Sequence, residues 1–225
     1  MTTERWITFD CFGTLIDWHA GYRAILAPLA GARTEALISA YHGFERALEA
    51  ERPHRLYRDV LTTGLARAAH EIGLALPPGE TDIVARRWGE LPLYPDVPAA
   101  LAALRAGGFR IGVLTNCDDD LFARTRERHP DLDPDLVVTA EQVGSYKPAA
   151  SHFLHFERVT GIARRNWVHA ACSWFHDIEP ARRLGIARVW VDRDRTGDDP
   201  AAASRVIPDL ANLATTAAAL VPRSA

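Results

Sequence analysis

The sequence predicts an α/β protein, in which a doubly wound parallel sheet carries a second, helical domain inserted after its first strand. Short apolar runs alternate with helical patterns from residue 97 onward, and strands that alternate with helices at this spacing form βα units around a parallel sheet. Residues 17–92 break this rhythm, because leucine, alanine and aromatic residues recur there at helical spacing without a convincing strand. A chain of 225 residues with 48% hydrophobic content is long enough for one full core and an accessory domain.

Apolar runs and glycines mark the strands and helices of the core. Five short apolar runs are predicted to be buried strands, at residues 5–10, 110–115, 136–139, 167–171 and 188–192. Helices are predicted at residues 97–106, 120–128, 150–160, 178–184 and 210–220. Glycine follows the first, third and fourth of these helices directly, as expected at a helix C-terminus. The stretch 198–203 is expected to be an exposed loop.

The inserted segment is predicted to be a small bundle of helices at residues 22–29, 35–51, 56–72 and 81–88. The predicted domains are therefore an α/β core of residues 1–16 and 93–225, and a helical cap of residues 17–92. Prolines stiffen the return to the core, so hinges are expected near residues 17–18 and 91–95. Closure of the cap would exclude water from the site below it.

Charge and cysteine content limit the classes of partner. The 26 basic and 29 acidic residues are interspersed and give a net charge of -3, so nothing favours nucleic acid or an anionic membrane. No apolar stretch approaches the roughly 18 residues that cross a bilayer, and the N-terminus does not resemble a signal peptide. The three cysteines are far apart and odd in number, which favours a reducing compartment. A soluble, cytoplasmic protein with a small-molecule substrate is expected.

The most informative stretch is residues 9–15, Phe-Asp-Cys-Phe-Gly-Thr-Leu. An apolar strand delivers the single carboxylate of Asp10 to its C-terminal end, and a glycine turn and the hydroxyl of Thr14 follow at once. In open parallel sheets, ligands bind outside the carboxyl ends of the strands. Asp10 is therefore the predicted nucleophile, although an aspartate here is also a common turn or cap residue.

Three further strand ends carry polar residues that a core does not need. They are Thr115 with Asn116, Lys147, and His176 with Asp177. Each has a plain structural explanation as a turn former, a surface lysine or a helix cap. The topology favours a site, because the C-terminal ends of parallel strands meet at one edge. One cleft would then collect a carboxylate nucleophile, a hydroxyl, an amide, a cation and a second carboxylate.

This order of motifs resembles the haloacid dehalogenase superfamily over essentially the whole chain. The four motifs are Asp-x-Phe-Gly-Thr-Leu, Leu-Thr-Asn, Ser-Tyr-Lys-Pro and an acidic segment, at residues 10–15, 114–116, 145–148 and 176–185. A helical cap inserted after the first motif also matches, and the resemblance suggests a dimer. It implies that Asp10 is the nucleophile and that Lys147 neutralises charge beside it. Thr115 and Asn116 would hold the departing group, and Asp177 would orient water or Lys147.

Phe12 decides between two branches of that superfamily. Members that transfer phosphoryl groups carry a second Asp at this position and bind Mg²⁺, but Phe12 has no proton to donate. Upstream of Asp177, where those members offer Gly-Asp, this chain has Ala171 and Cys172, and a thiol is a poor ligand for Mg²⁺. A Mg²⁺-dependent phosphatase is therefore the alternative rather than the first hypothesis. The L-2-haloacid dehalogenase branch has an aromatic residue here and needs no metal or other cofactor.

In that branch, Asp10 displaces halide from the α-carbon of a small carboxylic acid, and water hydrolyses the resulting ester. The predicted catalytic residues are Asp10, Thr14, Lys147, His176 as a general base, and Asp177. The predicted substrate-binding and leaving-group-binding residues are Phe12, Thr115, Asn116, Ser173 and Trp174. No metal ligand is predicted, His169 is expected to be a core histidine, and Asp118–Asp120 are expected to cap the helix that follows them.

The pocket departs from this branch at three places. The arginine expected on an early cap helix is replaced near residues 41–43, with Arg46 the nearest arginine. Phe153 replaces a substrate-side tyrosine, and residues 172–176 replace a Ser/Asn-rich stretch. Three alternatives stay open: a dehalogenase of altered specificity, a relative that opens another activated carbon centre such as a strained C–N ring, and a member that binds a metabolite without turnover.

Overall fold

The structure is a computed structural model that describes residues 4–223. A six-stranded sheet forms its centre in the order β3-β2-β1-β4-β5-β6, and every neighbouring pair of strands is parallel. The strands are β1 (Arg5–Phe9), β2 (Phe109–Thr115), β3 (Leu136–Thr139), β4 (Trp167–Ala171), β5 (Ala187–Val191) and β6 (Arg205–Ile207). The predicted α/β fold with a doubly wound parallel sheet is confirmed.

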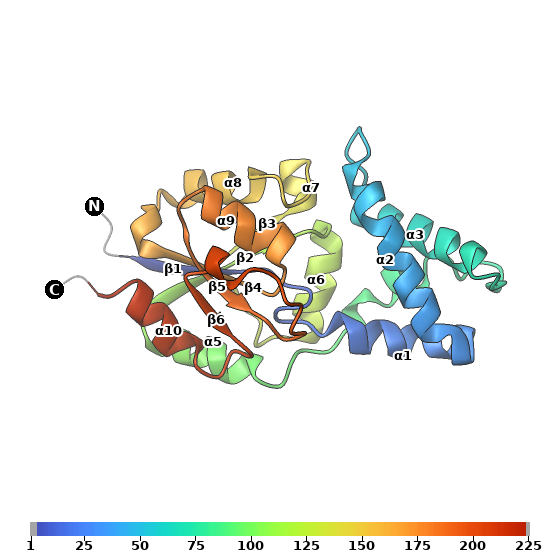
Figure 1. The fold of residues 1–225 in the computed structure, drawn as a ribbon, viewed down its shortest axis with the longest axis horizontal. Helices are drawn as coiled ribbons and strands as arrows, with labels where there is room; N and C mark the ends of the chain where they lie inside the picture. Colours follow the sequence, from blue (N-terminus) through green and yellow to red (C-terminus); the bar gives the residue numbers. More distant parts are fainter. Residues whose placement is uncertain (1–3, 224–225) are drawn as a thin grey trace.

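Helices cover both faces of the sheet (Figure 1). They are α5 (Val97–Ala106), α6 (Asp119–Arg128), α7 (Ala140–Val143), α8 (Ser151–Thr160), α9 (Glu179–Arg183) and α10 (Leu213–Leu220). Side chains alternate between the faces of a strand. Ile7 and Phe9 of β1 therefore pack in the core that includes α5 and α10, while Trp6 packs with Phe153 and Phe156 of α8 on the other face.

The C-terminal third differs from the prediction in three places. The sixth strand, β6, was not predicted, because only Ile207 of its three residues is buried and no apolar run marks it. The stretch 198–203 is not wholly an exposed loop, since Ala202 is buried in a short 3₁₀ helix (Pro200–Ala202). The predicted helix at 178–184 begins earlier, as a π-helical turn (Trp174–Ile178) that continues into α9.

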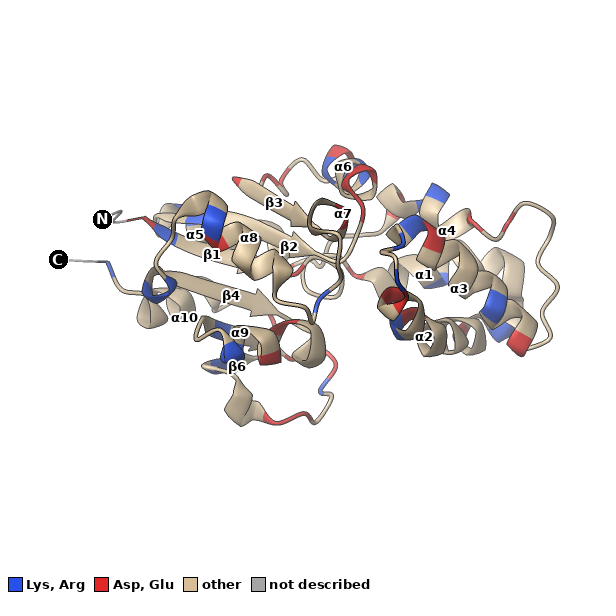
Figure 2. Cartoon of the chain, turned by 90° about the horizontal axis from the view of Figure 1, so that it is seen from above, with Lys and Arg blue, Asp and Glu red and all other residues tan. Residues whose placement is uncertain are grey.

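Residues 17–92, which we call the helical segment, form four α-helices. They are α1 (Trp18–Ala30), α2 (Thr34–Ala50), α3 (Tyr57–Glu71) and α4 (Ile83–Arg86). Figure 2 shows the strands of the core pointing towards it. The helices α2 and α3 pack closely where Gly64 faces Tyr41, since a Cβ at Gly64 would lie 2.7 Å from the ring. None of the helices within residues 4–223 is long and apolar enough to cross a membrane.

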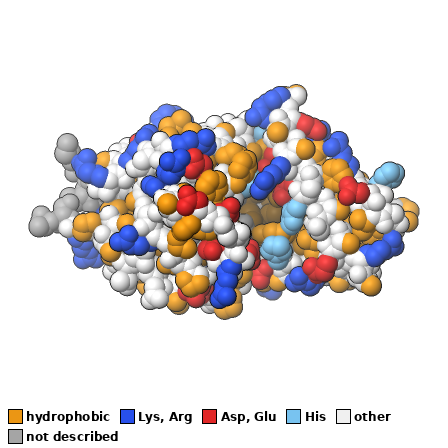
Figure 3. Space-filling model, in the orientation of Figure 1, with side chains coloured by type: hydrophobic (Ala, Val, Ile, Leu, Met, Phe, Trp, Pro, Cys, Tyr) orange, Lys and Arg blue, Asp and Glu red, His pale blue; other side chains and the backbone are white. Residues whose placement is uncertain are grey.

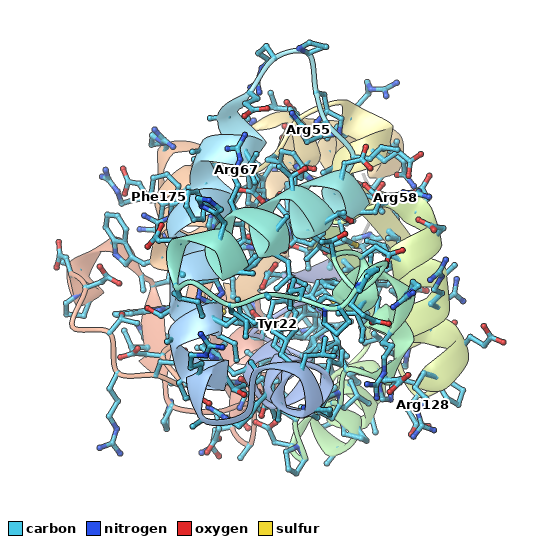
Figure 4. All side chains as sticks on the ribbon, turned by 90° about the vertical axis from the view of Figure 1, so that its right-hand side faces the viewer. Tyr22, Arg55, Arg58, Arg67, Arg128 and Phe175 are labelled. Carbon is cyan, nitrogen blue, oxygen red and sulfur yellow. The ribbon has the colours of Figure 1, made fainter. Side chains whose placement is uncertain are left out.

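Asp118 joins the helical segment to the core. Its carboxylate accepts hydrogen bonds from the backbone N–H groups of Tyr57 and Arg58, at 2.7 and 2.9 Å, and so caps α3. The expectation that Asp118 caps its own helix was wrong, because its side chain makes no capping bond to α6. Asp119 and Asp120 do lie in the first turn of α6. Arg58 also pairs with Asp120 at 2.7 Å, on the side of the molecule shown in Figure 4.

The two connections between the helical segment and the core lie side by side. Ile16 and Leu93 form an antiparallel bridge, and the N–H of Asp17 donates to the carbonyl of Pro92 at 2.8 Å. Gly21 of α1 packs against the second connection: a Cβ there would lie 2.2 Å from Cδ2 and 3.2 Å from Cα of Leu91. The predicted hinges lie where these two connections pair. Any hinge motion would therefore have to move both connections together.

This close packing makes Gly21→Ala a test of the crossing. We expect Gly21→Ala to lower the free energy of unfolding by about 1–3 kcal/mol, because the new methyl group forces Leu91 and its backbone to shift. Gly43→Ala is the matched control, because Gly43 lies on α2 with open space around it and should gain about 0.5–1 kcal/mol from helix propensity. Urea denaturation measures both, and equal stabilisation of the two variants would contradict this packing.

Candidate active site

A cavity of about 560 Å³ lies between the C-terminal edge of the sheet and the helical segment. Figure 3 shows a hollow between the two parts of the molecule, with histidine side chains beside it. The core lines this cavity with Asp10, Asn116, Lys147 and Asp177, among others. The structure thus brings these four residues to one place. Asp10 and Asn116 directly follow β1 and β2, whereas Lys147 lies beyond α7 and Asp177 lies in the π-helical turn after β4.

The ammonium of Lys147 lies at the centre of the site. Its Nζ donates to Oδ1 of Asp10 at 2.9 Å, to Oδ1 of Asp177 at 2.7 Å, and to the carbonyl of Leu114 at 2.8 Å. A lysine ammonium has three donors, so these acceptors satisfy all of them. Lys147 is only 1% exposed, which rules out the alternative that it is a surface lysine.

Asn116 holds the backbone of Lys147 in place. Its Oδ1 accepts from the Lys147 N–H at 2.7 Å, and its Nδ2 donates to the Lys147 carbonyl at 3.2 Å. Both groups of the amide side chain are thus engaged with one residue. Asn116 also lines the cavity, which is compatible with the predicted contact to a departing group.

The pKa shifts follow from this arrangement of charges. Although burial alone would lower it, the pKa of Lys147 is raised because Asp10 and Asp177 lie beside it. Burial alone would raise the pKa of Asp177, but Lys147 and His169 bring it down to about 2. Burial raises the pKa of Asp10 above the ordinary value, and Lys147 and Thr14 oppose that rise. At neutral pH, Lys147 is therefore a cation and Asp177 an anion.

Thr14 fixes the second oxygen of Asp10. Its Oγ1 donates to Oδ2 of Asp10 at 2.9 Å and accepts from the backbone N–H of Cys172 at 2.9 Å. The turn that brings Thr14 back has Gly13 at φ 99°, a conformation that favours glycine. Thr14 is fully buried and is not among the residues that line the cavity, so it positions the carboxylate instead of contacting a substrate.

His169 is a buried histidine, as expected, but it also belongs to the site. The indole Nε1 of Trp167 donates to Oγ1 of Thr8 at 2.8 Å, which leaves the Thr8 hydroxyl to donate to Nδ1 of His169 at 2.8 Å. This order assigns the ring hydrogen to Nε2, which donates to Oδ1 of Asp177 at 3.0 Å. A buried hydrogen-bond chain from β1 and β4 thus orients Asp177.

One oxygen of Asp177 stays open. Oδ1 accepts from both Lys147 and His169, whereas Oδ2 is buried without a hydrogen-bond partner within residues 4–223. Asp177 lines the cavity. Oδ2 is therefore an acceptor without a competing internal donor.

The remaining predicted residues divide into two groups. Phe12, Ser173, Trp174 and His176 all line the cavity. The ring of Phe12 packs against Trp88 with centroids 4.5 Å apart. Thr115 does not line the cavity: it is fully buried and its hydroxyl lies 3.5 Å from the sulfur of Cys117, so the structure does not bring it to a departing group.

His176 is held by its neighbour in the π-helical turn. Its Nδ1 lies 2.9 Å from Oγ of Ser173, while Nε2 is buried without a hydrogen-bond partner in the described part of the chain. Burial lowers the pKa of His176 to about 4, so its imidazole is neutral at neutral pH. Glu49 of α2 is its nearest acidic neighbour, with Oε2 at 3.9 Å from Nε2.

Sequence reasoning missed the residues that the helical segment contributes. His42, Glu45, Arg46 and Glu49 of α2 all line the cavity, and so do aromatic side chains of the segment: Trp18, Tyr22, Tyr57 and Trp88. The signal was present, because positions 42, 45, 46 and 49 lie on one face of a helix. A polar stripe of this kind is usually a solvated surface, and only the structure shows that it faces the core.

The donor set of the site does not fit Mg²⁺. Asp10 and Asp177 each give Oδ1 to the Lys147 ammonium, and Phe12 and Cys172 stand where further oxygen ligands would be needed. Within residues 4–223, no three His, Cys, Asp or Glu side chains converge as a metal site. We therefore derive no step through a metal ion.

The chain through His169 leads to a testable result. In His169→Phe, Asp177 loses a donor and Thr8 loses an acceptor, so the free energy of unfolding should fall by about 1–3 kcal/mol at neutral pH. His169→Gln keeps an N–H at the position of Nε2 and should recover part of this loss. Urea denaturation of the three proteins measures the effect.

The effect should depend on pH with a defined sign. His169 helps to lower the pKa of Asp177 from 3.8 to about 2, so its contribution is present above pH 3.8 and is lost as the pH falls towards 2. The difference between wild type and His169→Phe should shrink in that range. A difference that stays constant down to pH 2 would show that His169 does not act through Asp177.

Comparison with known proteins places this chain and its fold among known hydrolases. The chain is 32% identical to the phosphoserine phosphatase of Thermus thermophilus over 123 residues, which cover 53% of this chain and only 47% of that protein. It is 21% identical to haloacetate dehalogenase H-2 of a Moraxella species, over 86% of this chain and 90% of that protein. It shares its fold with a solved L-2-haloacid dehalogenase from Xanthobacter autotrophicus that has chloropropionic acid covalently bound. The TM-score is 0.79 and the sequence identity is 18%, over 94% of this chain and 97% of that chain. The family model of haloacid dehalogenase-like hydrolases matches residues 4–185, and the chain therefore belongs to that family.

Proposed function

We propose that this protein is a metal-independent hydrolase that displaces halide, or a similarly activated leaving group, from C2 of a small 2-substituted carboxylic acid. One observation carries the proposal. Asp10 is held in the cavity by Lys147 and Thr14, and the position that would carry a general acid holds the ring of Phe12. The site thus offers an oriented carboxylate nucleophile without a proton donor, which suits a leaving group that departs as a stable anion.

In the first step, an oxygen of Asp10 attacks C2 of the substrate from the side opposite to the halogen. The new C–O bond forms as the carbon–halogen bond breaks, and halide leaves with its electron pair. The product is an ester between Asp10 and the substrate. Lys147 and Thr14 hold one oxygen each, so the carboxylate is oriented before the substrate arrives.

In the second step, water attacks the carbonyl carbon of the Asp10 ester. Oδ2 of Asp177 accepts a hydrogen bond from this water, and neutral Nε2 of His176 takes its proton. The C–O bond between the Asp10 carbonyl and the substrate oxygen then breaks, and that oxygen takes the second proton of the water from the tetrahedral intermediate. The 2-hydroxy acid leaves, and the Asp10 carboxylate is restored. His176 then returns its proton to solvent.

We further propose that the helical segment acts as a cap, with residues 17–92 closing on the core of residues 1–16 and 93–225. Three of its helices line the cavity together with the core, and the paired connections at Ile16 and Leu93 supply a place for the movement. A cytoplasmic location and a homodimer are proposals as well. The first is supported by the free thiols of Cys11, Cys117 and Cys172, and the second by family resemblance alone.

Chloride release from L-2-chloropropionate in excess EDTA tests the proposed reaction. We expect wild type to release chloride at the same rate with and without EDTA, and Asp10→Asn to lose activity by roughly a thousandfold or more. Asp10→Asn is nearly isosteric, so folding is checked by its circular dichroism spectrum. Stimulation by Mg²⁺ together with release of phosphate from phosphoesters would instead support the phosphatase alternative.

A further inference from the structure

The wall that the helical segment contributes to the cavity is acidic. Glu45 and Glu49 lie one turn apart on α2 and both line the cavity. Glu49 is only 9% exposed, and its closest basic neighbour is the neutral imidazole of His176, at 3.9 Å, beyond hydrogen-bond distance. Asn116 hydrogen-bonds to Glu49, and the charges of Lys147 and Arg46 act on it, but burial still raises the pKa of Glu49 well above its ordinary value. A cation bound directly beside it would therefore favour its charged form.

Acidic side chains outnumber the cations in the cavity lining. Six acidic side chains line it, of which Asp194 and Asp198 are exposed to solvent, and the permanently charged cations among its lining residues are Lys147 and Arg46 alone. Lys147 is already shared between Asp10 and Asp177. The guanidinium of Arg46 lies 4.7 Å from the ring centre of Phe175, which Figure 4 shows beside α2. Burial lowers the pKa of His42 to about 4, as it does for His176, so neither imidazole supplies a charge at neutral pH.

Aromatic side chains surround the acidic wall. Trp18, Tyr22, Tyr57 and Trp88 line the same cavity, and the Tyr57 hydroxyl donates to Glu45 at 2.5 Å. Aromatic faces together with carboxylates are the groups that bind ammonium ions in proteins. An extra carboxylate on the ligand would instead face carboxylates here.

Three buried polar atoms of lining residues have no hydrogen-bond partner within residues 4–223. They are Nε2 of His176, Oδ2 of Asp177 and Nε1 of Trp88, and the last two belong to side chains that are 0% and 1% exposed. Asp177 and Trp88 lie outside α2, and their unpartnered atoms indicate a ligand with both a hydrogen-bond donor and an acceptor.

We propose that the substrate carries a protonated amine, which Glu49 binds between the aromatic walls of the helical segment. This inference rests on the proposed function for the reaction at C2. It adds an ammonium group to the proposed substrate. The substrate class is then a small 2-substituted acid with an ammonium group, which binds more tightly than a simple 2-haloacid. Burial raises the pKa values of Glu45 and Glu49, and a bound ammonium would oppose that rise for Glu49.

A matched pair of ligands tests this proposal. 2-Chloro-3-aminopropanoate and 2-chlorobutanoate differ by an ammonium in place of a methyl group, at nearly equal size. Calorimetric titration of the Asp10→Asn protein at pH 7 should give a dissociation constant about tenfold or more lower for the amino compound. Adding Glu49→Gln should remove this preference. Adding Glu71→Gln, an equal charge change at an exposed position of α3, should leave it intact.

The outcomes separate this inference from the proposed function. Equal affinities, tighter binding of 2-chlorobutanoate, no detectable binding of the amino compound, or a preference that survives Glu49→Gln would each overturn the ammonium site. Chloride release from either compound by wild type is measured in parallel. Release that depends on Asp10 but shows no preference for the amine would leave the proposed reaction standing and this inference rejected. A preference that depends on Glu49 without chloride release from either compound would reject the reaction and keep the binding site.

Discussion

The rest of the site depends on the shared ammonium of Lys147. It joins the carboxylate at the end of β1, the carboxylate that follows β4, and a carbonyl of β2, so three parts of the sheet edge are tied at one atom. Removing one partner from a buried ion pair typically costs about 3–5 kcal/mol, because the charges left behind have no solvent. Without this ammonium, Asp10 and Asp177 would repel each other, and Asp10, the proposed nucleophile, would be protonated more readily.

The core side and the helical side of the cavity differ in how their polar groups are held. On the core side, Lys147 and Thr14 each hold one oxygen of Asp10. Lys147 and His169 both donate to Oδ1 of Asp177, so buried neighbours orient both carboxylates. On the helical side, Nε1 of Trp88 is buried without a hydrogen-bond partner in the described part of the chain, and the nearest basic group to Glu49 is the imidazole of His176, at 3.9 Å. The proposed reaction thus uses groups of the core, and the proposed selection of the substrate uses groups of the helical segment.

Site residues that follow strand ends could be predicted from the sequence, whereas contacts between residues far apart in the chain could not. Asp10, Lys147 and Asp177 were predictable, because the ends of parallel strands meet at one edge. His169 looked like a core residue, since nothing in its strand reveals that Asp177 lies against it. Asp118 caps a helix that starts 61 residues earlier in the chain, and no local pattern encodes such a bond. The acidic face of α2 resembled a solvated surface, and β6 has too little apolar sequence to be recognised.

A single-turnover reaction in H₂¹⁸O tests the central claim most directly, with enzyme in excess over 2-chloropropionate and mass spectrometry of both the product and the Asp10 peptide. Attack by Asp10 on carbon, followed by water attack on the ester carbonyl, predicts ¹⁸O in the Asp10 carboxylate. The same sequence of steps predicts that the first-turnover product contains none. Label in the hydroxyl group of that product, with an unlabelled Asp10, would mean that water attacks the substrate directly and would contradict the account.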